Sequence, residues 1–176
     1  MSGSGTARSK PVRPDPGLLW PAYTLFPLAG LLILVFGATG HDTALTVIGI
    51  GLLAVNAATV VNQLYFTTLA VEDDELTHRT WLGLQQQSVA IGSIQRISAK
   101  RYAGAHGGVS APHLLVRGRE TNLRVNTKPY RLREIAALIE LVRAVNPRVE
   151  LDDFWTRVGR GEDVSKEVEP TARARF

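Results

Sequence analysis

The sequence predicts an α+β membrane protein: a two-helix transmembrane hairpin, then a small antiparallel β-sheet that a C-terminal amphipathic helix caps. Two apolar runs without Asp, Glu, Lys or Arg cover residues 18–38 and 44–66. Short alternating stretches separated by turn-forming residues follow the second run, which is typical of strands. A later segment repeats apolar residues at three- and four-residue steps, which is typical of an amphipathic helix.

Each apolar run is long enough to span a membrane, because about 20 apolar residues cover a hydrocarbon core about 30 Å thick. Each run holds eleven Leu, Ile, Val or Phe residues. On the insertion scale these residues contribute roughly 3–6 kcal/mol per run before polar costs. The alternative is a pair of buried helices in a soluble protein. A chain of 176 residues has too few polar residues to cover two helices that are apolar on all sides.

The charged flanks predict the orientation of the hairpin. Arg8, Lys10 and Arg13 precede the first run, residues 39–43 between the runs hold no Lys or Arg, and basic residues recur after the second run. The positive-inside rule therefore predicts that both termini are cytoplasmic. A cleaved signal peptide does not fit, because the first run is too long and a second run follows it directly.

Composition divides the chain into four parts. Residues 1–16 are rich in Ser, Gly, Pro and basic residues and are expected to form a disordered leader. The hairpin covers residues 17–66, and one cytoplasmic domain covers residues 67–147. Residues 148–176 are expected to be a polar, mostly disordered tail, in which residues 151–158 form a short helix that docks on the domain or the membrane.

The second apolar run carries a polar residue, Asn56, near its middle. Such a side chain usually makes a helix–helix hydrogen bond, worth about 0.6 kcal/mol on average, and the alternative is part of a transport path. We therefore take Asn56 as a candidate intramembrane helix contact. The small residues Gly30, Gly37, Gly49 and Gly51 are expected to let the two helices approach closely.

The domain is expected to contain short antiparallel strands and one helix. Residues 67–71 and 76–82 flank an acidic turn at residues 72–75 and predict a hairpin. Further strands are predicted over residues 84–91, 94–102, 114–116 and 122–127, with no helix between them. The final helix is predicted over Arg131–Val145, with Asn146 and Pro147 ending it.

This order of elements resembles the bacterial pleckstrin-homology (PH)-like membrane proteins. The resemblance rests on Tyr65–Leu76, on Ser88–Ile97 and on Leu123–Val125. It implies a PH-like sheet or partial barrel capped by the helix, which serves as a binding or oligomerisation platform in a multi-pass protein of the bacterial inner membrane. The acidic turn at residues 72–75 departs from the basic loop of phosphoinositide-binding PH domains and would repel a phosphate.

Residues 67–147 hold eleven Lys and Arg against seven Asp and Glu. The candidate contacts with an anionic surface are Arg96, Lys100, Arg101, Arg117, Arg119 and Lys128. The alternative is a solvated strand face. The expected partners are the lipid bilayer, a protein partner or a second copy of the chain, and anionic lipid is a further candidate. Basic and aromatic residues do not interleave as they do in nucleic-acid-binding proteins, so no nucleic acid is expected.

No catalytic, metal or cofactor site is predicted. The chain has no Cys, and its four His residues share no ligand spacing. The glycine-rich segment 104–108 precedes no helix that would hold a phosphate. Ser110, His113 and Asp152 have no nucleophile elbow. We therefore expect a membrane-anchored, non-enzymatic binding or scaffold protein. The alternative is an accessory subunit or assembly factor that acts through its spans, and an oligomeric channel ranks last.

Overall fold

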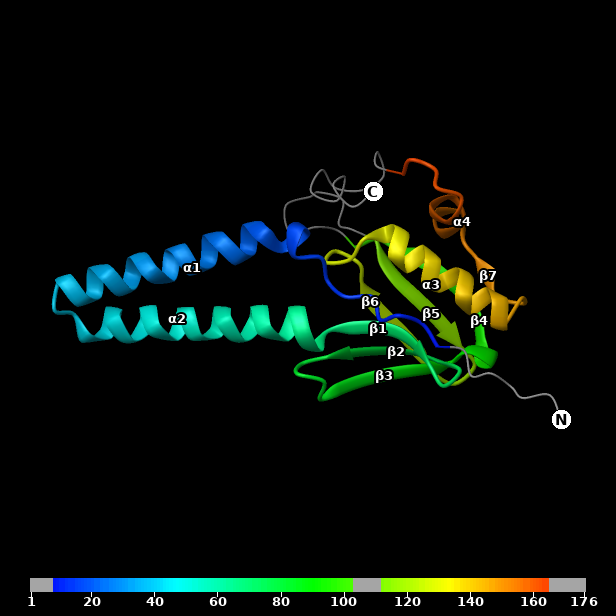
Figure 1. Cartoon of the computed structure of the whole chain (residues 1–176), viewed down its shortest axis with the longest axis horizontal. Helices are drawn as coiled ribbons and strands as arrows, with labels where there is room; N and C mark the ends of the chain where they lie inside the picture. The colour runs from blue at the N-terminus through cyan, green and yellow to red at the C-terminus, as the bar shows by residue number, and fades with distance from the viewer. Residues whose placement is uncertain (1–7, 103–111, 165–176) are drawn as a thin grey trace.

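Two antiparallel helices project from a β-rich domain in the computed structural model (Figure 1). The structure describes residues 8–102 and 112–164, apart from the side chains of residues 21 and 22. Helix α1 covers Pro16–Thr39, α2 covers Thr43–Val61, and the π-helical turn η1 covers Asn62–Phe66. Asp15 and Asp42 start the two long helices, because each carboxylate accepts a backbone N–H of the first turn.

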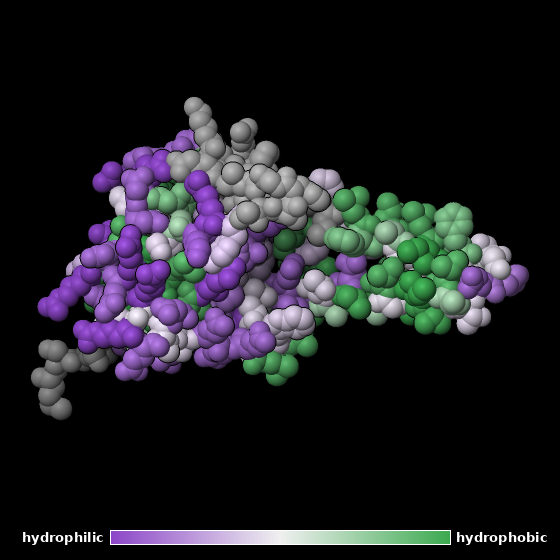
Figure 2. All heavy atoms as spheres, turned by 180° about the vertical axis from the view of Figure 1, so that it is seen from behind, coloured by the Kyte–Doolittle hydropathy of each residue, from purple (hydrophilic) through white to green (hydrophobic). Residues whose placement is uncertain are grey.

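Both helices of the hairpin are long and apolar enough to cross a membrane, and only 6 % of each apolar stretch is buried. Leucine, valine, isoleucine and phenylalanine side chains therefore cover the outside of the hairpin, which Figure 2 shows as a hydrophobic projection from a hydrophilic domain. A continuous apolar surface of this kind is rare in a monomeric soluble protein.

Glycines hold the two helices close together. A Cβ atom built on Gly49 would lie 2.6 Å from the backbone nitrogen of Leu34, so a larger residue would push the helices apart. Gly37 and Gly30 likewise face the neighbouring helix, whereas a Cβ on Gly51 would meet nothing within 4 Å. The expected close approach is confirmed for Gly30, Gly37 and Gly49 and is wrong for Gly51, which lies on the outer face.

The strands agree with the predicted segments but form two separate sheets. The first sheet has the order β1 (Thr68–Glu72), β2 (Glu75–Thr80), β3 (Gln85–Ala90). The second has the order β6 (Asn122–Asn126), β5 (His113–Gly118), β4 (Ile94–Lys100), β7 (Glu150–Leu151). All pairs are antiparallel except β4 and β7. The 3₁₀ turn η2 (Ile91–Ser93) carries the chain from β3 into the second sheet, so these described strands do not form one continuous sheet.

Two helices complete the domain core. Helix α3 (Leu132–Val145) contacts β1, η2 and α4 (Asp153–Gly159). Its apolar face follows the predicted three- and four-residue period, and the residues buried on it are Leu132, Ile135, Ala136, Leu138, Ile139 and Val142. They pack with the inward-facing residues of both sheets, among them Leu69, Ile97 and Val116.

The leader is ordered where the structure describes it, so the expectation of a disordered segment is wrong for residues 8–16. Val12 exchanges two backbone hydrogen bonds with Leu69, which extends the first sheet beyond β1. Asp15 then forms an ion pair with Arg131 at the start of α3. An edge strand leaves N–H and C=O groups unpaired, and the leader satisfies those of β1.

The tail is also ordered over its first part. The predicted docking helix is confirmed as α4, which packs against α3 and β4. Asp152 caps α4 by accepting the backbone N–H of Trp155, and it also accepts the backbone N–H of Ala99 in β4. Phe154, Trp155 and Val158 of α4 are buried in the core. Val149 and Val164, on either side of the predicted helix, are buried there too, so the expectation of disorder outside that helix is wrong as far as residue 164. The predicted loop at residues 103–111 and the remaining tail lie outside the described residues.

Candidate functional site

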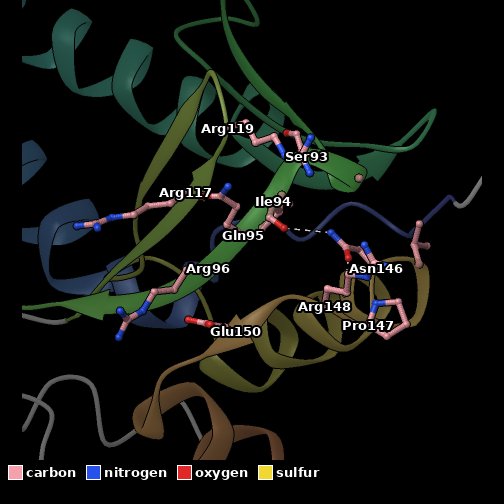
Figure 3. Close-up of a pocket in the computed structure, with 12 residues that line it drawn as sticks. Ser93, Ile94, Gln95, Arg96, Arg117, Arg119, Asn146, Pro147, Arg148 and Glu150 are labelled. Carbon is pink, nitrogen blue, oxygen red and sulfur yellow. Dashed lines mark hydrogen bonds between the residues drawn. The ribbon is translucent and has the colours of Figure 1, made fainter.

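A basic pocket of about 700 Å³ lies between the start of β4, the end of β5 and the end of α3. Figure 3 shows its lining. Four arginines and one glutamate line it: Arg96, Arg117, Arg119, Arg148 and Glu150. Ser93, Gln95 and Asn146 add hydrogen-bonding groups. The excess of positive charge and the donors favour an anionic ligand group, such as a carboxylate or a phosphate.

Two of these arginines face each other across the sheet. Arg96 of β4 lies opposite Arg117 of β5 in the antiparallel register, and both are exposed. Their side chains extend in the same direction in Figure 3. Like charges directly opposite in a sheet are destabilising. Glu150 of β7 pairs with Arg96 on the other side of β4 and brings one negative charge to the cluster. Two positive side chains therefore lie side by side on this exposed face, with the Glu150 carboxylate on the neighbouring strand as the countercharge.

Two residues position the wall of the pocket. Asn146 ends α3, and its side-chain amide donates to the backbone oxygens of Ile91 (2.9 Å) and Ile94 (3.0 Å). Gly118 lies between Arg117 and Arg119, and a Cβ on it would lie 2.7 Å from the backbone oxygen of Thr121. The same Cβ would lie 3.1 Å from the hydroxyl oxygen of Ser93 in η2, so a larger residue would have to shift the β5–β6 turn and its contact with η2.

The pocket lies at the end of the domain farthest from the hairpin. β1 leaves the hairpin, β2 returns toward it and β3 runs away from it again. The backbone N–H of Ile91 then donates to the oxygen of Asp74 in the β1–β2 turn, at 2.9 Å. This contact places η2, which lines the pocket, at the distal end of the first sheet. Figure 1 agrees, because the hairpin and the end of α3 lie at opposite ends of the molecule.

The other candidate basic residues lie elsewhere. Lys100 is the last residue of β4 and Arg101 follows it, at the opposite end of the strand from the pocket. The Lys100 amine lies 5.2 Å from the centre of the Tyr102 ring, and the Arg101 guanidinium lies 5.9 Å from that of Phe154. Arg124 also stacks on Tyr102, at 4.1 Å. Lys128 is exposed beside Pro129, whose oxygen accepts the N–H of Asp15 next to α1. The structure thus brings Arg96, Arg117 and Arg119 together and leaves Lys100, Arg101 and Lys128 apart from them.

A second cavity, of about 550 Å³, separates the base of α2 from the domain. Its walls are mainly apolar and include Val55 and Ala58 of α2. His78 and Tyr130 also line it, with 3.4 Å between the imidazole Nε2 and the phenol oxygen. Burial lowers the pKa of His78 to about 4, so its imidazole is neutral at neutral pH. Burial also raises the pKa of the Tyr130 phenol.

Asn56 is half-buried on α2. Its side chain makes no hydrogen bond within the described part of the chain, so its role as a helix contact stays a prediction. No group of three or more His, Asp or Glu residues able to hold a metal ion occurs within residues 8–102 and 112–164.

Sequence reasoning missed Arg148 as a site residue. It lies just beyond the predicted helix end at Asn146 and Pro147, in a segment that we expected to be tail. Its backbone N–H donates to the Asn146 side-chain oxygen at 3.2 Å, which fixes the chain direction into the pocket wall. The signal that could have identified Arg148 in the sequence is its position directly after Asn146 and Pro147, which end the helix.

No family model, no curated protein and no solved structure matches the chain.

Proposed function

We propose that this chain is a membrane-anchored, non-enzymatic binding protein whose basic pocket receives an anionic group of a partner on the cytoplasmic side. The observation that carries the proposal is the Arg96–Arg117 pair, joined by Arg119 and Arg148 in one pocket. An anionic ligand would remove the repulsion within the pair and gain hydrogen bonds from planar guanidinium groups.

The position of the pocket favours an acidic segment of a protein over the lipid in which the hairpin lies. The hairpin is proposed to cross the inner membrane of a bacterium twice, with both termini in the cytoplasm. The pocket then faces the aqueous phase, at the end of the domain that is farthest from the hairpin. Electrostatic attraction falls off within about 10 Å at physiological salt, so headgroups of the same bilayer would contribute little there.

The resemblance to bacterial PH-like proteins remains part of this proposal. Two small sheets with a C-terminal helix against them suit a binding platform.

The test is binding of a fluorescent oligoglutamate peptide to the full chain in nanodiscs of neutral lipid, followed by anisotropy across a salt series. We expect salt-sensitive binding that weakens by about tenfold or more in R117E/R119E, because a loss of 1.4 kcal/mol is a factor of ten. K128E/R133E, which also reverses two charges, is the matched control, since Lys128 and Arg133 are exposed and do not line the pocket. Equal loss in both variants would contradict a specific pocket.

A second candidate function is that of an accessory subunit acting through its spans. One observation favours it: Gly51 lies open on the outer face of α2, where a partner helix could approach. Replacement of both spans by a neutral apolar hairpin would abolish function under this hypothesis, whereas the binding protein would keep it.

A further inference from the structure

The turn between β2 and β3 exposes three large apolar side chains. Trp81, Leu82 and Leu84 have 66 %, 51 % and 85 % of their surface accessible. The backbones of Trp81 and Leu82 are in the left-handed region, with φ of 50° and 58°. Bulky residues rarely adopt this conformation because it costs energy. The turn holds apolar side chains in an unfavourable conformation without burying them, which points to a contact outside the chain.

The turn is tied to the base of the hairpin. The backbone N–H of Leu82 donates to the side-chain oxygen of Asn62, at 2.6 Å. Asn62 is the first residue of η1, directly after the regular part of α2. In Figure 1 the turn lies on the hairpin side of the domain, beside this end of α2. The depth of Asn62 in a membrane would therefore also give the depth of the turn.

The length of α2 predicts the depth of Asn62 in a membrane. About 20 helical residues rise about 30 Å, the thickness of a hydrocarbon core. Thr43 starts α2, so a spanning helix reaches the cytoplasmic boundary of the core close to Asn62. Trp20 and Tyr65 lie near the same end of the hairpin and are 62 % and 64 % exposed. Exposed Trp and Tyr side chains are enriched at this boundary of membrane proteins.

The composition of the turn fits the same environment. Residues 80–88 contain no charged side chain, although the domain around them is rich in Lys, Arg, Asp and Glu. An uncharged segment enters the interface without the desolvation cost of an ion. Trp81 and Leu82 also line the mainly apolar cavity beside Val55 of α2, so their apolar surface continues that of the hairpin.

We propose that the β2–β3 turn, residues 81–84, inserts into the cytoplasmic interface of the bilayer that the hairpin crosses, as a third membrane contact. This inference rests on the proposed membrane insertion of the hairpin. An inserted turn beside the base of the hairpin opposes tilting of the domain relative to the bilayer, because tilting would pull the turn out of the interface or push it deeper. The basic pocket is then held facing away from the lipid.

Spin labels on the full chain in liposomes test the inference, since the chain has no Cys and accepts single labels. Leu84→Cys reports the turn, and its exposure means that a label there leaves the fold intact. Asp73→Cys, in the β1–β2 turn at the other end of the same sheet, is the matched control. Ile50→Cys, exposed in the middle of α2, reports insertion of the hairpin itself. Collision rates with oxygen, which enters lipid, and with a water-soluble nickel complex give the depth of each label.

We expect the labels at residues 50 and 84 to collide more with oxygen than with nickel, and the label at residue 73 to show the reverse. If residue 50 lies in lipid while residue 84 behaves like residue 73, the turn inference is overturned and the proposed anchor stands. If residue 50 collides mainly with nickel, both are overturned. Protection of residue 84 from both reagents would mean a protein contact and would also overturn the inference.

Discussion

The hairpin and the domain bury opposite kinds of residue. The described buried positions of α1 and α2 are glycines, while Phe36 and Val55 point outward with 68 % and 66 % of their surface accessible. The domain buries its large apolar residues, and Leu69, Ile97 and Val116 are fully enclosed. Hydrophobic burial drives association in water, but lipid chains are as apolar as leucine, so helices in lipid gain from close backbone contact instead. The comparison teaches that the two regions follow opposite rules of burial, which is what the proposed insertion of the hairpin in lipid requires.

The largest effect that would sharpen this comparison is expected at Trp155, which is 1 % exposed in α4. Trp155→Ala should lower the free energy of unfolding of the domain by about 3–5 kcal/mol, because a large cavity remains. Phe36→Ala, at an exposed aromatic of the hairpin, should leave domain unfolding unchanged. Urea unfolding followed by pulse proteolysis in neutral nanodiscs measures both variants.

A milder variant separates the loss of ring volume at this position from the loss of the polar N–H group. The indole Nε1 of Trp155 has no hydrogen-bond partner among the described residues. Trp155→Phe keeps most of the ring volume and removes that N–H group, so it should cost much less than Trp155→Ala. Equal losses in the two variants would show that α4 is not held by core packing.

The next largest effect is the pH dependence of the free energy of unfolding of the domain. The pKa of His78 is lowered to about 4 by burial, while an unfolded His titrates near 6.5. Between these values the unfolded chain binds a proton that the folded chain does not, so the free energy of unfolding falls as pH falls from 6.5 to 4. The full loss is roughly 3 kcal/mol.

His78→Gln should flatten the pH dependence of domain unfolding in that window. His113→Gln is the comparison variant, because the pKa of His113 is also lowered, by its partial burial and by Arg124, but less strongly. The measurement is urea unfolding at pH 7, 6, 5 and 4.5. A slope that persists unchanged in His78→Gln would show that other groups carry it.

Substitution of a glycine between α1 and α2 is expected to weaken the packing of the hairpin without affecting the domain. Gly49→Leu places a side chain against the backbone of Leu34, and overpacking of this kind costs about 1–3 kcal/mol. Gly51→Leu meets open space and should be neutral. The electrophoretic mobility of the hairpin in detergent reports how tightly α1 and α2 pack. If both variants open the hairpin equally, glycine contact is not what holds it.

The smallest effect concerns the junction of the two regions, where Asp15 pairs with Arg131. Burial by itself raises the pKa of Asp15, but hydrogen bonds from Arg131 and from the backbone N–H of Gly17 outweigh it, and the pKa lies below 3.8. The stabilisation is therefore present above pH 3.8 and is lost as pH falls through the lower folded pKa. Asp15→Asn should slightly increase proteolysis of the leader at pH 7, because the ion pair with Arg131 is lost. Proteolysis of the unsubstituted leader should rise as Asp15 is protonated in acid, and the variant should not show this rise. No change at pH 7 would show that the β1 pairing alone holds the leader.

Local patterns in the sequence predicted most elements and part of the site. The strands β1 to β6 and helix α3 lie within a few residues of the predicted segments, because alternation and three- and four-residue steps act over short distances. Arg96, Arg117 and Arg119 were candidates from charge alone. Their grouping, and the addition of Arg148, depend on the β4–β5 register and on the Asn146 contact with Ile91 and Ile94.

The sequence by itself determined the two apolar helices, the turns and the amphipathic helix, since each follows from the chemistry of neighbouring residues. The tertiary structure alone decided that the leader pairs with β1, that residues 148–164 join the core and that the strands divide into two sheets. It also decided that the arginines gather far from the hairpin while Trp81 and Leu84 lie near its base. These are contacts between residues that are tens of positions apart, and no local period encodes which segments meet.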